Sequence, residues 1–100
     1  MIKYIVKIEK GNNVIIFYTD KANTSTIPSY GCIYPKTYGF NRNCWEFNEA
    51  SLSYYQSCKN PTLAHQSDVN KAIQAFIEAV EVECVQAFRF TQKDKEEMWK

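Results

Sequence analysis

The sequence predicts an α+β domain in which an antiparallel sheet of three to five strands, built on an N-terminal hairpin, carries one main helix on one face. Two observations predict this fold class. Apolar and polar residues alternate with the two-residue period of strands in the N-terminal third, and apolar residues recur at helical spacing in the C-terminal third. A length of 100 residues suits a single domain, residues 1–100, with one hydrophobic core.

The N-terminal hairpin is the clearest element. Residues 3–9 alternate between apolar and polar types, with Ile5 as the one apolar exception on the polar face. Residues 10–13 contain Gly and Asn, which tolerate the positive φ angles of tight turns. Residues 14–18 then form a second strand that is apolar on both faces, so we expect it near the middle of its sheet.

The middle of the chain is predicted to be irregular over residues 21–43, where Pro and Gly recur. No helix is compatible with this spacing, and any strand is expected to be short and at an edge. Loops of this length in a compact domain are usually functional or mobile. Residues 44–47 alternate as a short third strand with Trp45 and Phe47 on one face.

A short helix is expected after this strand. Residues 48–51 offer capping side chains, residues 52–58 carry apolar residues at helical spacing, and Asn60-Pro61 ends the helix. The alternative is a fourth strand over residues 52–56, since Ser and Tyr suit strands better than helices.

The C-terminal third predicts a helix, a strand and a second short helix. Ser67 is expected to cap a helix over residues 68–79, and a strand is expected over residues 82–90. One long helix is the alternative, but it leaves the β-branched and aromatic residues after the first helix poorly explained. Thr91 is expected to cap a terminal helix over residues 92–99.

These elements together predict one core. We expect it to contain Tyr4, Val6, Ile8, Ile16, Trp45, Phe47, Ile73, Phe76, Ile77, Val80, Cys84 and Phe88.

Charge and composition restrict the class of protein. A net charge of +1 argues against a dedicated nucleic-acid binder. The sequence shows no signal peptide and no apolar run long enough to span a membrane, so a cytoplasmic protein without a membrane partner is expected. Lys greatly outnumbers Arg, and Asn, Ile and Tyr are frequent, which is typical of the AT-rich genomes of some bacteria and phages. The cysteines are expected to be reduced, buried and inert, with spacing that does not suit zinc: Cys32, Cys44, Cys58 and Cys84.

No catalytic or cofactor-binding motif is present. His65 is the single histidine, and a Cys58–His65 pair, as in a thiol-dependent enzyme, is the least favoured reading because nothing in the sequence orients the imidazole. The acidic residues near residue 80 are expected to form a solvated face, and no glycine-rich phosphate loop or metal-binding spacing occurs. We therefore expect no enzyme activity, no cofactor and no metal.

The tyrosine-rich segment over residues 30–42 is the most unusual part of the sequence. Tyr spaced by Gly, Thr and Asn is the composition of loop binding surfaces, and Lys and Arg add donors at the rim. The alternative is that these rings fold back and cover an open face of the sheet. The candidate partner-binding residues are Tyr30, Tyr34, Lys36, Tyr38, Phe40 and Arg42.

We therefore expect a small protein-binding module, an inhibitor or adaptor acting on a larger bacterial or phage-targeted machine. The alternative function is single-stranded nucleic-acid binding, in which rings stack on bases and basic side chains contact phosphates. A homodimer formed by strand addition at a sheet edge is also compatible with the sequence. The residues suited to nucleic-acid binding are Lys21, Tyr30, Tyr34, Lys36, Tyr38 and Arg42.

Overall fold

The computed structural model describes residues 2–20, 36–41, 44–82 and 86–97. Within this part of the chain, five strands form one sheet in the order β4-β3-β2-β1-β5. The strands are β1 (Ile2–Ile8), β2 (Val14–Asp20), β3 (Lys36–Asn41), β4 (Cys44–Glu49) and β5 (Ala87–Arg89). The helices are α3 (Leu52–Ser57), the 3-10 turn η1 (Leu63–His65), α4 (Gln66–Glu81) and α5 (Gln92–Glu97). The α+β fold class is therefore confirmed.

The N-terminal hairpin is confirmed. β1 and β2 pair antiparallel from Ile2 opposite Asp20 to Ile8 opposite Val14. The turn between them places Asn12 at a φ of 61°, a left-handed conformation that Asn tolerates better than most residues. β2 lies in the middle of the sheet, as its two apolar faces predict.

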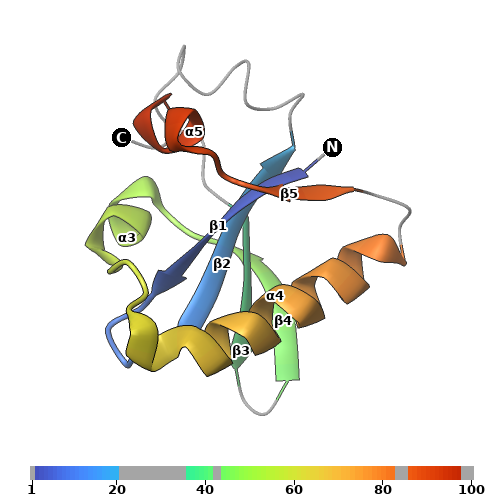
Figure 1. Cartoon of the computed structure of the whole chain (residues 1–100), viewed down its shortest axis with the longest axis horizontal. Helices are drawn as coiled ribbons and strands as arrows, with labels where there is room; N and C mark the ends of the chain where they lie inside the picture. The colour runs from blue at the N-terminus through green and yellow to red at the C-terminus, as the bar shows by residue number, and fades with distance from the viewer. Residues whose placement is uncertain (1, 21–35, 42–43, 83–85, 98–100) are drawn as a thin grey trace.

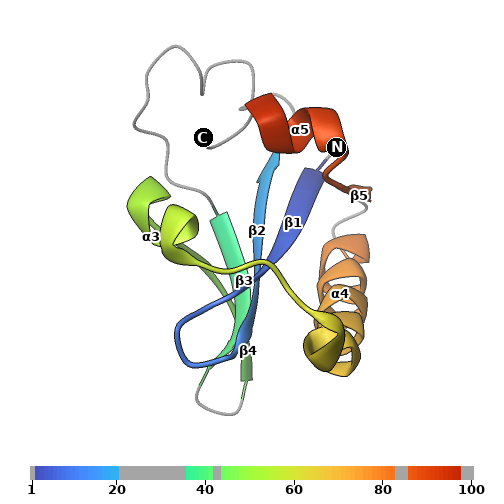
Figure 2. The ribbon, with the colours of Figure 1, turned by 60° about the vertical axis from the view of Figure 1, so that its left-hand side comes forward.

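The sheet separates two cores, with α4 and α3 on opposite sides of it (Figures 1 and 2). We call these sides the α4 face and the α3 face. The core on the α4 face contains Tyr4, Val6, Ile8, Val14, Ile16, Tyr38, Val69, Ala72, Phe76 and Val80. The core on the α3 face contains Ile5, Phe17, Tyr55 and Phe90. The expectation of a single core was therefore wrong, and Ile5 belongs to the second one.

Half of the predicted core is fully buried, and the structure corrects two aromatic positions. Trp45, Ile73 and Ile77 are only partly buried against the α4 core. Phe47 and Phe88 are exposed, because each lies on an edge strand where no second layer covers it. Cys84 lies outside the described residues. The buried residues that were predicted are Tyr4, Val6, Ile8, Ile16, Phe76 and Val80.

Residues 36–41, which were expected to be irregular or at an edge, form an interior strand. β3 pairs antiparallel with both β2 and β4. A Cβ at Gly39 would meet Ile15 Cγ1 at 3.6 Å, an ordinary contact, so this position of the strand does not require glycine. The reason for the error is that Pro35 precedes the strand and only one glycine lies within it.

The short helix after β4 is confirmed, and the alternative strand is excluded. α3 begins after Ser51, whose Oγ accepts a hydrogen bond from the backbone N–H of Tyr54 at 3.1 Å. α4 begins two residues earlier than predicted, at Gln66, so Ser67 lies inside the helix and His65 occupies the cap position. The turn η1 continues directly into α4, which explains the shift of its start.

A strand follows α4, as predicted, but it is short and parallel to its neighbour. β5 covers only Ala87–Arg89 and pairs with β1 in parallel, so the sheet is not purely antiparallel. The crossover through α4 returns the chain in the direction of β1, which is what a parallel pair requires. The terminal helix is confirmed over Gln92–Glu97, and Thr91 Oγ1 accepts from the N–H of Asp94 at 3.2 Å. Within the described ranges, no helix is long and apolar enough to cross a membrane.

Candidate functional site

The structure describes three of the six predicted partner-binding residues. Lys36, Tyr38 and Phe40 alternate along β3, with Lys36 exposed at its start. Tyr30, Tyr34 and Arg42 lie outside the described residues. The part of the tyrosine-rich segment that is described is therefore a strand.

Three aromatic side chains form a patch at the outer end of the α4 face. Phe40 on β3 is 51% exposed, Phe47 on β4 is 50% exposed, and Trp45 on β4 is partly buried. The ring centroids of Phe40 and Trp45 lie 5.4 Å apart with their planes at 65°. We call Phe40, Trp45 and Phe47 the aromatic patch.

Tyr38 supports the aromatic patch from beneath. It is only 5% exposed, and its ring stacks on Trp45 at 5.3 Å with an interplanar angle of 3°. The Tyr38 ring also lies 4.4 Å from that of Phe47 and 5.6 Å from that of Phe76 in the α4 core. Burial, together with the carboxylate of Glu78, raises the pKa of Tyr38. Tyr38 therefore connects the exposed rings to the core.

The register of β3 and β4 explains why these rings meet. Tyr38 lies opposite Phe47, and Phe40 lies opposite Trp45. Directly opposite residues in an antiparallel pair project their side chains to the same face, where they pack in pairs. Two short alternating segments thus gather four aromatic residues on one side of the sheet.

β4 is an edge strand, and the described chain pairs no strand with its outer side. Backbone hydrogen bonds alternate in direction along an antiparallel strand. The N–H of Ile2 and the N–H and C=O of Ile8 form hydrogen bonds on the side of β1 that faces away from β2. The even residues of β1 therefore direct their backbone groups away from β2, and the continuous registers carry this alternation across the sheet to β4. It follows that the even residues of β4 face β3. The outer edge is formed by the N–H and C=O groups of Trp45, Phe47 and Glu49.

The backbone groups on this outer edge belong to the same residues that supply two rings of the aromatic patch. An exposed edge without Pro or Lys is a template for pairing with another chain, and β4 reads Cys-Trp-Glu-Phe-Asn-Glu. A shallow pocket of about 210 Å³ adjoins Phe40 and Trp45, and Asp68 and Lys71 of α4 form its polar side. The site combines apolar contact area, a hydrogen-bonding edge and a polar rim.

The candidate thiol and histidine do not form a catalytic pair among the described residues. The Nδ1 atom of His65 lies 3.0 Å from the backbone N of Thr62, which donates to it. Burial and the nearby Glu9 carboxylate raise the pKa of the Cys58 thiol, which opposes formation of the nucleophilic thiolate. Cys44 is exposed, contrary to the expectation of buried thiols, because it lies at the start of the edge strand.

Sequence reasoning assigned Trp45 and Phe47 to the core and therefore missed their place in the site. Alternating aromatic residues indicate a strand with one apolar face, but they do not show whether a second layer covers that face. Phe76 of α4 packs against Tyr38, whereas Phe47 remains half exposed. Comparison with protein-family models, with curated proteins and with solved structures returns no match to this chain.

Proposed function

We propose that the chain is a protein-binding module whose contact surface is the aromatic patch together with the outer edge of β4. The observation that carries this proposal is the pair of half-exposed Phe rings, Phe40 and Phe47, on and beside a strand whose outer edge pairs with no strand of the described residues. The partner adds an extended segment to β4, so that main-chain hydrogen bonds supply affinity and the rings receive its apolar side chains.

The energetics of such a site are favourable. Aromatic side chains dominate the affinity of many interfaces because they bury a large area and lose little rotamer entropy. Two rings of the patch are also held in place before binding, since Tyr38 stacks on Trp45 and packs at an angle against Phe47. A contact surface that is already ordered loses less entropy on association.

Stoichiometric binding, as an inhibitor or an adaptor, is the mode of action that we propose for a chain of this size. We further propose that it acts in the cytoplasm. The Cys58 thiol forms no disulfide, which suits a reducing compartment.

The test is affinity capture from a lysate of the source organism with three forms of the tagged protein: wild type, Phe47→Ser and Phe88→Ser. Phe88 is the matched control, because it is 45% exposed and lies on β5, the opposite edge of the sheet. We expect the wild type and Phe88→Ser to retain one protein at near one-to-one stoichiometry, and Phe47→Ser to lose it. Thermal unfolding of each variant checks that the fold is kept.

Three results contradict the proposal. Equal capture by all three proteins places the contact elsewhere, and capture that disappears after nuclease treatment indicates nucleic acid as the ligand. If the only retained partner is a second copy of the chain, and sedimentation shows a dimer that Phe47→Ser dissociates, the surface is a self-association interface.

A further inference from the structure

The outer side of β1 contains a gap in its backbone hydrogen bonding. β5 pairs with β1 only as far as Tyr4, whose C=O accepts a hydrogen bond from the N–H of Phe90 at 2.7 Å. Further along the same side, the N–H and C=O of Ile8 both bond to Lys59. Val6 lies between these two contacts, and as an even residue of β1 it directs its backbone groups to this side. No described residue forms a hydrogen bond with the N–H or C=O of Val6.

Pro61 explains why the neighbouring segment does not close this gap. Lys59 lies opposite Ile8 in an antiparallel bridge, so a continuation of this pairing would place Pro61 opposite Val6. Proline has no N–H to donate, so it cannot satisfy the C=O of Val6. Val6 is only 2% exposed, and buried backbone groups in native proteins are nearly always paired. The two backbone groups of Val6 therefore point to a ligand.

A pocket of about 540 Å³ opens at the same place. It is lined both by Ile5, which belongs to the core on the α3 face, and by Val6, which belongs to the core on the α4 face. Consecutive strand residues point their side chains to opposite faces, so a pocket that both of them line lies at the edge of the strand. The backbone groups of Val6 are therefore within reach of a molecule in this pocket.

The charged side chains in the lining of this pocket are basic. Arg89 and Lys95 are exposed, and no described Asp or Glu lines the pocket or forms an ion pair with either of them. Lys7 adds a positive charge close by, because its Nζ donates to Oδ1 of Asn60, a lining residue, at 2.8 Å. Burial lowers the pKa of Lys7, and the charge of Lys95 lowers it further, which shows that these cations are close together. The pocket therefore favours a negatively charged group.

We propose that this pocket binds an acylated amino acid or the last residue of a peptide, paired with Val6 and with its carboxylate held beside Arg89. In an antiparallel pair, opposite residues exchange two N–H···O=C bonds, so one ligand residue satisfies both groups of Val6. A ligand that runs in the direction of Lys59 has its carboxyl end toward Tyr4, which lies opposite Arg89. β5 occupies the edge from Tyr4 onward, so the ligand chain ends at this point.

The walls of the pocket favour an apolar side chain on the bound residue. A residue opposite Val6 projects its side chain to the α4 face, where Leu63 and Val69 line the pocket. Leu63 is 91% exposed, so a bound apolar side chain would remove part of its surface from water. The volume suits an acylated leucine, since pockets for small ligands span about 300–1,000 Å³.

The test is a titration of the isotope-labelled protein with N-acetyl-L-leucine, followed by the backbone amide chemical shifts of Val6, Lys7 and Phe90. Two control compounds each lack one contact: N-acetyl-L-leucinamide has no carboxylate, and isocaproate has no amide N–H. We expect saturable shifts with N-acetyl-L-leucine and at least about tenfold weaker binding of either control compound. Equal responses to the three compounds, or no response to N-acetyl-L-leucine, overturn the proposal.

Arg89→Gln tests the carboxylate contact from the side of the protein. Because Arg89 is exposed, the variant should keep the fold, and we expect it to bind N-acetyl-L-leucine about tenfold more weakly. Lys36→Gln is the matched control, since it removes one positive charge from an exposed residue of β3, which β2 separates from β1. If both variants weaken binding equally, the ligand responds to net charge alone and the proposal fails.

A longer ligand, acetyl-alanyl-alanyl-leucine, distinguishes the two sources of such a group. If it binds more tightly than N-acetyl-L-leucine, the ligand is the carboxyl terminus of a protein. If it does not bind although N-acetyl-L-leucine does, the ligand is a free acylated amino acid, because the segment at Lys59 leaves no room for a longer chain.

This inference does not depend on the proposed function, because the pocket lies beside β1 and the aromatic patch lies on β3 and β4. Phe47→Ser is expected to bind N-acetyl-L-leucine as the wild type does. Failure of the partner-binding proposal is therefore distinguishable from failure of this one.

Discussion

Asp94 joins the two ends of the described chain. Its Oδ1 atom accepts a hydrogen bond from Lys3 Nζ at 2.8 Å, and its Oδ2 atom accepts from the backbone N–H of Thr91 at 2.8 Å. Thr91 in turn caps α5, so one carboxylate links β1 to the C-terminal helix. The Lys3–Asp94 ion pair is only partly exposed, so it contributes more to the stability of the fold than a fully exposed ion pair does.

The ionisation of Asp94 should contribute to the pH dependence of stability. Burial alone would raise the pKa of this carboxyl, but the hydrogen bonds from Lys3 and Thr91 outweigh burial and lower it below its ordinary value of 3.8. A carboxyl whose pKa is lowered on folding stabilises the folded state above its ordinary value, and that contribution is lost as the pH falls through the lowered value.

We predict that Asp94→Asn lowers the free energy of unfolding by about 1–3 kcal/mol at pH 7. The difference from the wild type should shrink below pH ~4, where the carboxyl of the unfolded chain protonates. Urea unfolding across this pH range measures both effects. Asp68→Asn is the control, since Asp68 is exposed in the first turn of α4 and should show little of this dependence. If the difference in unfolding free energy between Asp94→Asn and the wild type stayed constant at all pH values, the pKa of Asp94 would not be lowered on folding.

At the scale of elements, β2 supplies residues to both cores, as β1 also does. Ile16 belongs to the core under α4, and its neighbour Phe17 belongs to the core under α3. The Phe17 ring meets that of Tyr55 edge-on at 5.0 Å. α3 is only six residues long, too short to be stable alone, so this contact holds it on the sheet.

We predict that Phe17→Leu and Phe76→Leu each destabilise the protein by about 1–2 kcal/mol, since each removes apolar volume from a fully buried position. Phe88→Leu should cost less than about 0.5 kcal/mol, because Phe88 is half exposed. Urea denaturation of the three variants tests the ranking. If Phe88→Leu lowered the free energy of unfolding as much as Phe17→Leu, another part of the protein would have to cover β5, and the core on the α3 face would contribute little to stability.

For the whole molecule, the sequence predicts elements better than it predicts their environment. The hairpin, α3, α4 and the C-terminal helix follow from residue periodicity and capping, which are local signals. The place of β3 in the sheet does not follow from such signals, because it depends on pairing with β2 and β4 at the same time. The parallel pairing of β5 depends in the same way on a crossover through α4.

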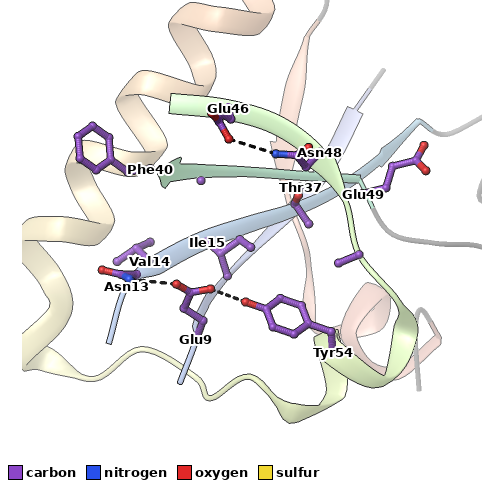
Figure 3. Close-up of a pocket in the computed structure, with 12 residues that line it drawn as sticks. Glu9, Asn13, Val14, Ile15, Thr37, Phe40, Glu46, Asn48, Glu49 and Tyr54 are labelled. Carbon is purple, nitrogen blue, oxygen red and sulfur yellow. Dashed lines mark hydrogen bonds between the residues drawn. The ribbon is translucent and has the colours of Figure 1, made fainter. Parts of the chain in front are cut away.

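In the candidate sites, too, the sequence predicts the residue types better than it predicts their burial and neighbours. The tyrosine-rich composition pointed to residues 30–42, of which the structure describes 36–41, yet burial of Tyr38 and exposure of Phe47 depend on which side chains pack over the sheet. The pocket of about 330 Å³ beside α3 (Figure 3) could not be predicted either, because its lining comes from segments far apart in the sequence, among them Glu9 just after β1 and Glu46 on β4.

The alternation along β4 should be visible in amide hydrogen exchange. The even residues Glu46 and Asn48 direct their N–H groups at β3, whereas Trp45, Phe47 and Glu49 direct theirs outward. In the isolated protein, neighbouring amides of this one strand should therefore exchange at alternating slow and fast rates. A partner that pairs with the edge would make all five amides slow, whereas one that contacts only the rings would leave the alternation in place. The exchange pattern of a single strand thus reports how a bound protein is held.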